Sequence, residues 1–174
     1  MTARPEFSRV VDCAALATGP VRRAIEAGEA ERQALAERFG LVALKALRAE
    51  VTLAPTTAGQ IRLDGRLAAR VVQACVVTLE SVEAEIAESF TLFYADEVAP
   101  PARAVDLPID DEAWPEPIED GRIDVGEAVA QQLALALDPY PRAPGARLDP
   151  AFGEAPATTP FAELAREKRP RRAR

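Results

Sequence analysis

Residues 61–94 read IRLDGRLAARVVQACVVTLESVEAEIAESFTLFY, and their pattern predicts the centre of a β-sheet. In its first part apolar and polar side chains alternate, a period of two that is typical of a half-buried β-strand. One face is apolar, and the other carries Arg62, Arg66 and Arg70. Gly65 interrupts the apolar face, which predicts a bulge or a sharp bend at that position. The stretch therefore predicts long strands with one face toward a core and the other toward solvent.

The second part of the stretch predicts a further strand. Its β-branched run has no helical period, so we expect the first strand to continue to about Leu79, before a short turn at residues 80–81. Residues 82–94 alternate again, but Glu88 falls on the apolar face and predicts a bulge. A helix over residues 82–90 is the alternative, because apolar side chains also recur four apart there. The run FTLFY at the end favours a strand.

The segments before this stretch supply partners for it. Residues 47–53 alternate in the same way, and the turn-rich residues 55–59 join them to the stretch, which predicts an antiparallel hairpin. Residues 29–39 consist of strong helix formers and are followed by Gly40, at the position where a left-handed residue ends a helix. Two short strands are expected earlier, one near Val10 and one over residues 21–25.

A second helix is predicted over residues 124–137. Asp124 is a good N-cap, and Glu127 stands three residues later as its capping-box partner. Apolar side chains follow on one face at helical spacing, at Val125, Val129, Leu133 and Leu137. We expect this apolar stripe to cover the apolar face of the sheet.

Between the sheet and this helix, residues 95–120 are rich in proline and in acidic side chains, opposed only by Arg103. They predict a long acidic loop. Oxygen clusters of this kind can hold Mg²⁺ or Ca²⁺, but no EF-hand spacing is present, so a solvated loop is the favoured interpretation. After Tyr140 the chain is rich in Pro and Gly, and a short helix is expected over residues 159–168.

These patterns predict an α+β fold. We expect an antiparallel, strongly bent or barrel-like sheet, two main helices and an extended C-terminal tail. Residues 1–154 are expected to form a single domain, and residues 155–174 the tail with its short helix and basic end. A chain of 174 residues can bury a real core without disulfides or metals.

Composition excludes several kinds of site. The chain has no histidine, which excludes Ser-His-Asp and Cys-His catalytic sites and zinc sites with imidazole ligands within it. Its two cysteines form neither a disulfide framework nor a four-cysteine zinc cage. No phosphate-binding glycine motif is present. We therefore expect no catalytic residue, no metal and no cofactor, and we interpret Cys75 as a small buried apolar residue, with a reactive thiol as the alternative.

The net charge of −7 divides into two opposed parts. The last nine residues carry +5, so the other 165 carry −12. The tail bases are Arg166, Lys168, Arg169, Arg171, Arg172 and Arg174. A basic end on an acidic body suggests contact with RNA or another acidic surface, with a solvated tail as the alternative.

The strand arginines Arg62, Arg66 and Arg70 are the second candidate contact for RNA or a partner. The alternative is that they are ordinary exposed strand residues, paired with neighbours such as Glu50 and Glu83. The first residues include charges and no apolar run, so we expect no signal peptide, and no stretch has the apolar length to span a membrane. A cytoplasmic protein without membrane contact is therefore expected.

Four segments resemble a known family. They are ERQALAERFGL (31–41), GRLAARVVQACVVTLESV (65–82), IDVGE leading into LALALDPYPR (123–142) and PFAEL (160–164). Together they resemble the YceD-like family of bacterial large ribosomal RNA subunit accumulation proteins, which has relatives in plastids. The PFAEL ending resembles that of the alphaproteobacterial branch. The residues that carry the family motifs are Gly65, Gln73, Cys75, Tyr140 and Arg142.

The resemblance implies a non-enzymatic role in the synthesis, processing or stability of large-subunit ribosomal RNA, or in ribosome assembly. The implied partners are that RNA or its precursor, ribosomal proteins and assembly factors, with no small-molecule substrate. Many relatives carry a second cysteine three residues after the first; this chain has Thr78 there and no cysteine after Cys75. Two alternatives remain open: a metal-dependent RNA-processing nuclease that uses the acidic loop, and a general protein-interaction module.

Overall fold

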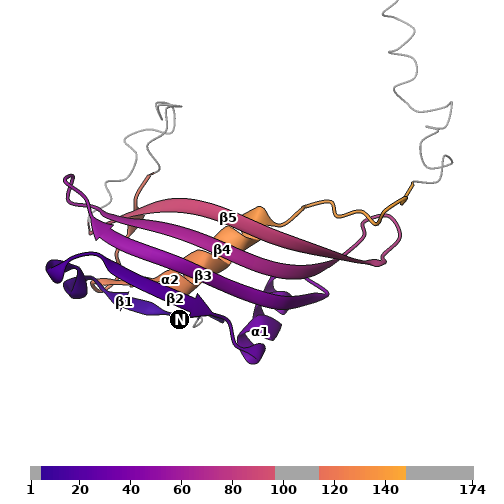
Figure 1. The fold of residues 1–174 in the computed structure, drawn as a ribbon, viewed down its shortest axis with the longest axis horizontal. Helices are drawn as coiled ribbons and strands as arrows, with labels where there is room; N and C mark the ends of the chain where they lie inside the picture. Colours follow the sequence, from indigo (N-terminus) through magenta and orange to yellow (C-terminus); the bar gives the residue numbers. More distant parts are fainter. Residues whose placement is uncertain (1–4, 97–113, 148–174) are drawn as a thin grey trace, which may run out of the picture.

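The computed structural model describes residues 5–96 and 114–147, and two sheets and three helices are formed by them. A two-stranded sheet pairs β1 with β7, and a five-stranded sheet has the order β2-β3-β4-β5-β6 (Figure 1). In chain order the elements are β1 (Val10–Asp12), the 3-10 helix η1 (Cys13–Thr18), β2 (Val21–Glu26), α1 (Glu29–Phe39), β3 (Ala43–Pro55), β4 (Ile61–Ala74), β5 (Ser81–Ala95), β6 (Glu116–Pro117), β7 (Arg122–Asp124) and α2 (Val125–Ala136).

The α+β class and the predicted hairpins are confirmed, but the barrel-like sheet is wrong. Strands β2 to β5 are antiparallel neighbours, and β6 pairs in parallel with the end of β5, so the sheet is mixed. It is neither closed nor strongly curled, and β2 and β5 remain far apart on opposite sides of it (Figure 1). The sheet does not need to wrap around its own apolar face, because other elements cover that face.

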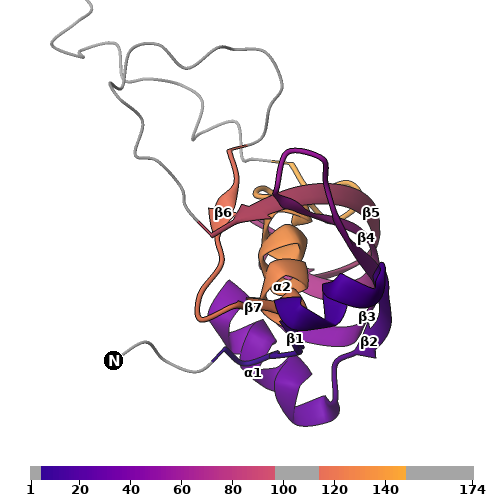
Figure 2. The ribbon, with the colours of Figure 1, turned by 90° about the vertical axis from the view of Figure 1, so that its left-hand side faces the viewer.

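Helix α2 covers this face over β4 and β5, as its apolar stripe predicts. It lies against one face of the large sheet, beside the small β1–β7 sheet (Figure 2), and contacts β4, β5 and β1. Its residues Val125, Val129 and Leu133 are fully buried. Gly126 lets the start of α2 lie close to the backbone of the N-terminal segment, since a Cβ there would lie 2.5 Å from the carbonyl oxygen of Phe7. We call the covered face the inner face of the sheet and the opposite face the outer face.

Both predicted helices are confirmed, with their caps. The bounds of α1 are the predicted ones, and Gly40 ends it with φ 64° in the left-handed region. Helix α2 ends one residue earlier than predicted, at Ala136, and Asp124 caps its first turn by accepting the backbone N–H groups of Gly126 and Glu127. Glu127 does not serve as the predicted capping-box partner, because its carboxylate binds Arg38 of α1 at 2.7 Å.

The predicted bulges at Gly65 and Glu88 are wrong. The pairing of β4 with β5 runs without interruption through Gly65↔Phe90 and Leu67↔Glu88. Gly65 instead accommodates the ring of Phe90, which a Cβ at position 65 would overlap. The register shifts elsewhere, between Leu44 and Ala46 of β3.

Strand β4 is shorter than predicted and ends at Ala74 instead of Leu79. Residues 75–80 form a tight turn in which the N–H of Leu79 donates to the carbonyl of Cys75 at 2.9 Å. Leu79 has φ 62°, a left-handed conformation that is uncommon for residues other than glycine. The β-branched composition of residues 75–80 resembles that of a strand, so the sequence pattern does not reveal this turn.

The predicted acidic loop is only partly described. Residues 97–113 lie outside the described residues, whereas Glu116 and Pro117 form β6, which corrects the prediction of a continuous loop. The pairing of β6 begins beside Tyr94, where the N–H of Ile118 donates to the carbonyl of Ala95 at 3.0 Å. The predicted tail helix, the basic end and the domain boundary at residue 154 also lie outside the described residues.

Candidate nucleic-acid interface

The outer face of the sheet carries the polar half of each strand's alternation. Neighbouring residues on adjacent strands point to the same side, so the register sorts them into rows. One row holds Arg22, Thr52, Asp64 and Thr91, and the next holds Ala24, Glu50, Arg66 and Ser89. No helix of the described residues covers this face (Figure 2).

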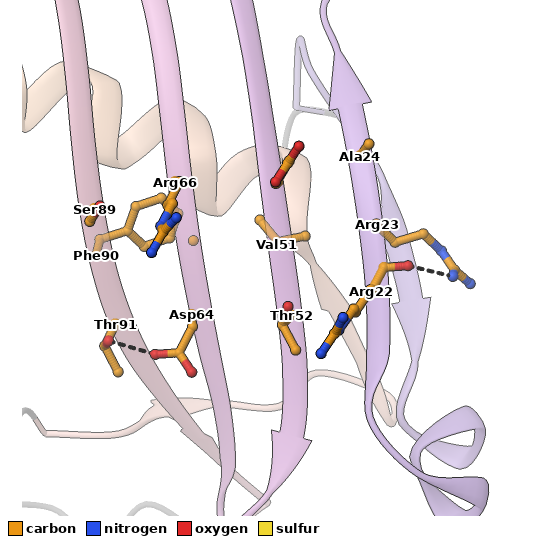
Figure 3. A pocket seen from close by; sticks show the side chains of 12 residues that line it. Arg22, Arg23, Ala24, Val51, Thr52, Asp64, Arg66, Ser89, Phe90 and Thr91 are labelled. Carbon is orange, nitrogen blue, oxygen red and sulfur yellow. Dashed lines mark hydrogen bonds between the residues drawn. The ribbon is translucent and has the colours of Figure 1, made fainter.

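A groove of about 730 Å³ lies over these two rows (Figure 3). Arg22 and Arg66 approach it from β2 and β4, on either side of β3, while Arg23 points past the edge of β2. On its floor the hydroxyl of Thr91 donates to the carboxylate of Asp64 at 2.8 Å. Both guanidinium groups line the groove, beside Glu50 and Asp64, and a guanidinium group suits bidentate hydrogen bonds to an anion.

Two of the three predicted strand arginines form ion pairs with acidic side chains. Arg62 binds Asp64 at 2.7 Å, and Arg70 lies 3.2 Å from Glu85. Arg70 is also 3.9 Å from Glu83, the neighbour that the alternative interpretation named. These pairs are exposed and individually weak, but they neutralise Arg62 and Arg70 locally.

Arg66 differs from the other two. Within the described residues it makes no ion pair shorter than 4.0 Å, although Glu50 is its cross-strand neighbour on β3. The same holds for Arg22 and Arg48, which flank it on β2 and β3. A second hollow, of about 540 Å³, continues the groove from Arg66 to Arg48. Three arginines with available donors therefore follow one path across the outer face.

The remaining basic candidates cannot be placed relative to this face. Arg166, Lys168, Arg169, Arg171 and Arg172 all lie outside the described residues.

The family-motif residues, in contrast, gather at one end of the sheet. There the turn after β4 meets the segment that follows α2. The side-chain amide of Gln73 donates to the carbonyl of Asp138 at 2.9 Å, and the N–H of Val76 donates to the carbonyl of Pro141 at 2.9 Å. Tyr140 projects from this segment and is 72% exposed, and Arg142 is exposed as well. Gly65 lies further along β4, beneath Phe90.

Cys75 is fully buried at the centre of this junction, as predicted. Its pKa is lowered to about 7, mainly because the backbone N–H of Ala143 donates to the sulfur, with a further contribution from the side chain of Thr78. The backbone N–H groups of Val77 and Thr78 also donate to the sulfur, each at 3.4 Å. Burial of the thiol acts in the opposite direction.

This donor set does not fit a metal ion. A bound metal needs further electron-pair donors beside the thiolate, whereas the groups around Cys75 are N–H donors that point at the sulfur. The hydroxyl of Thr78, in place of the second cysteine of many relatives, donates to Glu80 at 3.1 Å. Within residues 5–96 and 114–147 no three metal-ligating side chains come together.

The sequence pattern did not identify Arg22 and Arg48 as companions of Arg66. Both stand at polar positions of alternating segments, but which strands are neighbours is fixed only by the fold. The contact of residues 73–76 with residues 138–141 was also missed, because it joins segments more than 60 residues apart. Across the same described part of the chain, no helix has both the length and the apolar character to cross a membrane.

Comparison with known families matches residues 63–173 to the family described as "Large ribosomal RNA subunit accumulation protein YceD". No curated protein and no solved structure matches the chain. The match includes all of the motif segments from β4 onward, among them the turn at Cys75 and the start of α2. The chain therefore belongs to the YceD family of large ribosomal RNA subunit accumulation proteins, whose members are generally treated as non-enzymatic and have a role in large-subunit ribosomal RNA accumulation or ribosome assembly.

Proposed function

We propose that this protein is a non-enzymatic factor in the synthesis, processing or stability of large-subunit ribosomal RNA, acting in the cytoplasm on the RNA or its precursor. The observation that carries the proposal is the family match over residues 63–173. The PFAEL ending at residues 160–164 supports the alphaproteobacterial type. The absence of histidine supports a binding role over catalysis.

We propose that RNA binds at two basic places. The first is the outer-face path of Arg22, Arg48 and Arg66, whose guanidinium groups have available donors for phosphate oxygens. The second is the basic end, residues 166–174. Arg62 and Arg70 contribute less, because their acidic neighbours compete with phosphate.

The rest of the chain carries a large negative charge, which repels bare RNA. We therefore propose that the acidic part binds basic ribosomal proteins or assembly factors while the two basic places contact RNA. Such a factor holds protein and RNA together in an assembling large subunit.

A salt series with purified protein and a large-subunit precursor transcript tests the RNA contact. Each phosphate contact that is lost should make the slope of log K against log salt shallower by about 0.7 to 0.9. Arg66→Gln and deletion of residues 166–174 should each weaken binding and make the slope shallower. Arg62→Gln is the matched control on the same strand face, and it should change binding less.

Unchanged affinity and slope in both the deletion and Arg66→Gln would contradict the proposed contacts. Incubation with Mg²⁺ or Mn²⁺ separates the binding factor from the nuclease alternative. The transcript should remain intact, and metal-dependent cleavage by the purified protein would overturn the non-enzymatic role.

A further inference from the structure

Strand β5 leaves one of its edges unpaired along most of its length. The N–H of Cys75 donates to the carbonyl of Glu80, which fixes the phase of the β4–β5 ladder. In that phase the odd-numbered residues of β5 direct their N–H and C=O groups away from β4. Strand β6 pairs only with Tyr94 and Ala95. Within the described part of the chain, the outward groups at residues 81–93 therefore have no strand beside them.

The inner face is also incompletely covered at this edge. The inner-facing residues of β4, such as Leu63 and Val71, are fully buried, and so is nearly every inner position of β3. On β5 the apolar inner-facing side chains before Tyr94 are only half-buried, at Val82, Ala84, Ile86, Phe90 and Leu92, and Glu88 on the same face is exposed. At the opposite edge of the sheet, Val21 and Ile25 of β2 are buried. One further strand beside β5 would cover these half-buried apolar side chains.

The charge of this edge is strongly negative. Residues 80–96 contain five acidic side chains and no basic one. Glu83 contacts Lys45 and Glu85 contacts Arg70, both from strands behind β5, so these bases do not extend past the edge. Glu88 is exposed and makes no ion pair with a described residue. A chain that approaches β5 from outside therefore meets acidic side chains first.

We infer that the open edge of β5 binds an extended, basic protein segment as an added strand. The main-chain groups of β5 supply the hydrogen bonds of β-augmentation. Because side chains alternate across a sheet, a segment with basic residues at every second position would place them beside Glu83 and Glu85 on the outer face. Its other residues, if apolar, would cover Ile86 and Phe90 on the inner face.

The acidic edge argues against two other occupants. A second copy of β5 would bring two acidic strands side by side, and like charges on neighbouring strands are destabilising. RNA phosphates would be repelled for the same reason. This inference deepens the proposed function and rests on it for the class of partner, a basic ribosomal protein or assembly factor.

The test uses a synthetic peptide that alternates lysine with valine and matches β5 in length, with a glutamate–valine peptide as charge control. We expect the lysine peptide to bind the full chain and to slow hydrogen exchange at the outward N–H groups of β5. Those groups belong to Glu83, Glu85, Ala87, Ser89, Thr91 and Phe93. The glutamate peptide should not bind.

Two proline variants provide a matched pair. Ala87→Pro removes an outward N–H from β5, and Ala24→Pro removes an outward N–H from the other edge strand, β2. On β2 the N–H of Ala27 donates to the carbonyl of Leu47, so the N–H of Ala24 points away from β3. Ala87→Pro should weaken peptide binding about tenfold or more, and Ala24→Pro should leave it unchanged. Exchange protection of β4 in each variant reports whether the sheet still forms.

A triple variant, Glu83→Gln with Glu85→Gln and Glu88→Gln, keeps the backbone and tests charge alone. It should bind the lysine peptide more weakly and with a smaller dependence on salt. Equal binding by Ala87→Pro and the wild type, no binding of the peptide, or self-association of the wild type that Ala87→Pro abolishes would each overturn the inference.

Precursor RNA binding separates this inference from the proposed function. If Ala87→Pro binds the peptide as the wild type does while the wild type still binds precursor RNA, only the edge-strand inference fails. If the peptide result is as expected but no ribosomal precursor is bound, β5 keeps its basic ligand and the ribosomal role fails.

Discussion

The ring of Phe90 lies directly over Gly65 on the neighbouring strand, in the space that a Cβ at position 65 would occupy. An aromatic ring that covers a glycine across two strands pins their register, because a shift by one residue would turn the ring to the other face. Gly65 thus has a packing role in the sheet that presents Arg66. The pairing of β4 with β5 runs through this contact without any bulge.

Replacement of Gly65 by alanine should therefore destabilise the protein by about 1–3 kcal/mol, because the ring must move. Chemical denaturation measures the change. In the background of Phe90→Ala the same substitution should cost much less, since the two residues are coupled. Equal costs in both backgrounds would show that the ring is not the obstacle.

Asp124 ties the N-terminal segment to the start of α2. Its carboxylate accepts hydrogen bonds from the hydroxyl of Ser8 at 2.5 Å and the N–H of Arg9 at 2.7 Å, in addition to the helix N–H groups. Asp124→Ala should lower the free energy of unfolding by about 2–3 kcal/mol, from the lost cap and the unpaired donors. Asp124→Asn, which retains an acceptor oxygen, should cost less, and a thermal melt of both variants distinguishes them.

Arg38 joins α1 to α2 and to the N-terminal segment through two acidic residues. Its guanidinium binds Glu127 of α2 at 2.7 Å and Glu6 at 2.9 Å, and the two carboxylates raise its pKa. The side chain is about one-third exposed, so Arg38→Met should cost roughly 1 kcal/mol of stability at low salt. The difference from wild type should shrink in about 1 M salt, where such pairs are screened. A cost that does not depend on salt would point to lost packing.

The buried thiol of Cys75 should make stability depend on pH. Folding lowers its pKa from 9.0 to about 7, so the folded state favours the thiolate. The stabilisation is fully present above about pH 9 and is lost as the pH falls through about 7. In a Cys13→Ser background, the stability lost on Cys75→Ala should therefore grow between pH 7 and pH 9. Thiolate absorbance should show a midpoint near pH 7, and a midpoint near 9 would contradict the role of the N–H donors.

The sequence predicted those elements whose signals are local. The helix over residues 29–39 was placed correctly because helix formers, acidic residues in the first turn and Gly40 all agree. The alternating strands were found because apolar residues recur at every second position on one of their faces. The Asp124 cap was likewise visible in the sequence.

Features that depend on distant contacts were missed. The pairing of β1 with β7 joins residues more than 100 positions apart through only three residue pairs, too few for a pattern. The turn at Cys75 has the composition of a strand, and its shape depends on backbone bonds to residue 141. Of the candidate arginines, Arg66 could be named in advance. Its companions Arg22 and Arg48 could not, because the order of strands in the sheet determines which arginines meet.

The central claim, that the chain binds the RNA of the assembling large subunit, is tested most directly by crosslinking in growing cells, followed by sequencing of the RNA bound to the purified protein. We predict enrichment of large-subunit ribosomal RNA or its precursor, and a clear loss of that enrichment when Arg66→Gln is combined with deletion of residues 166–174. Recovery of no ribosomal RNA above background, or equal recovery by wild type and variant, would contradict the account.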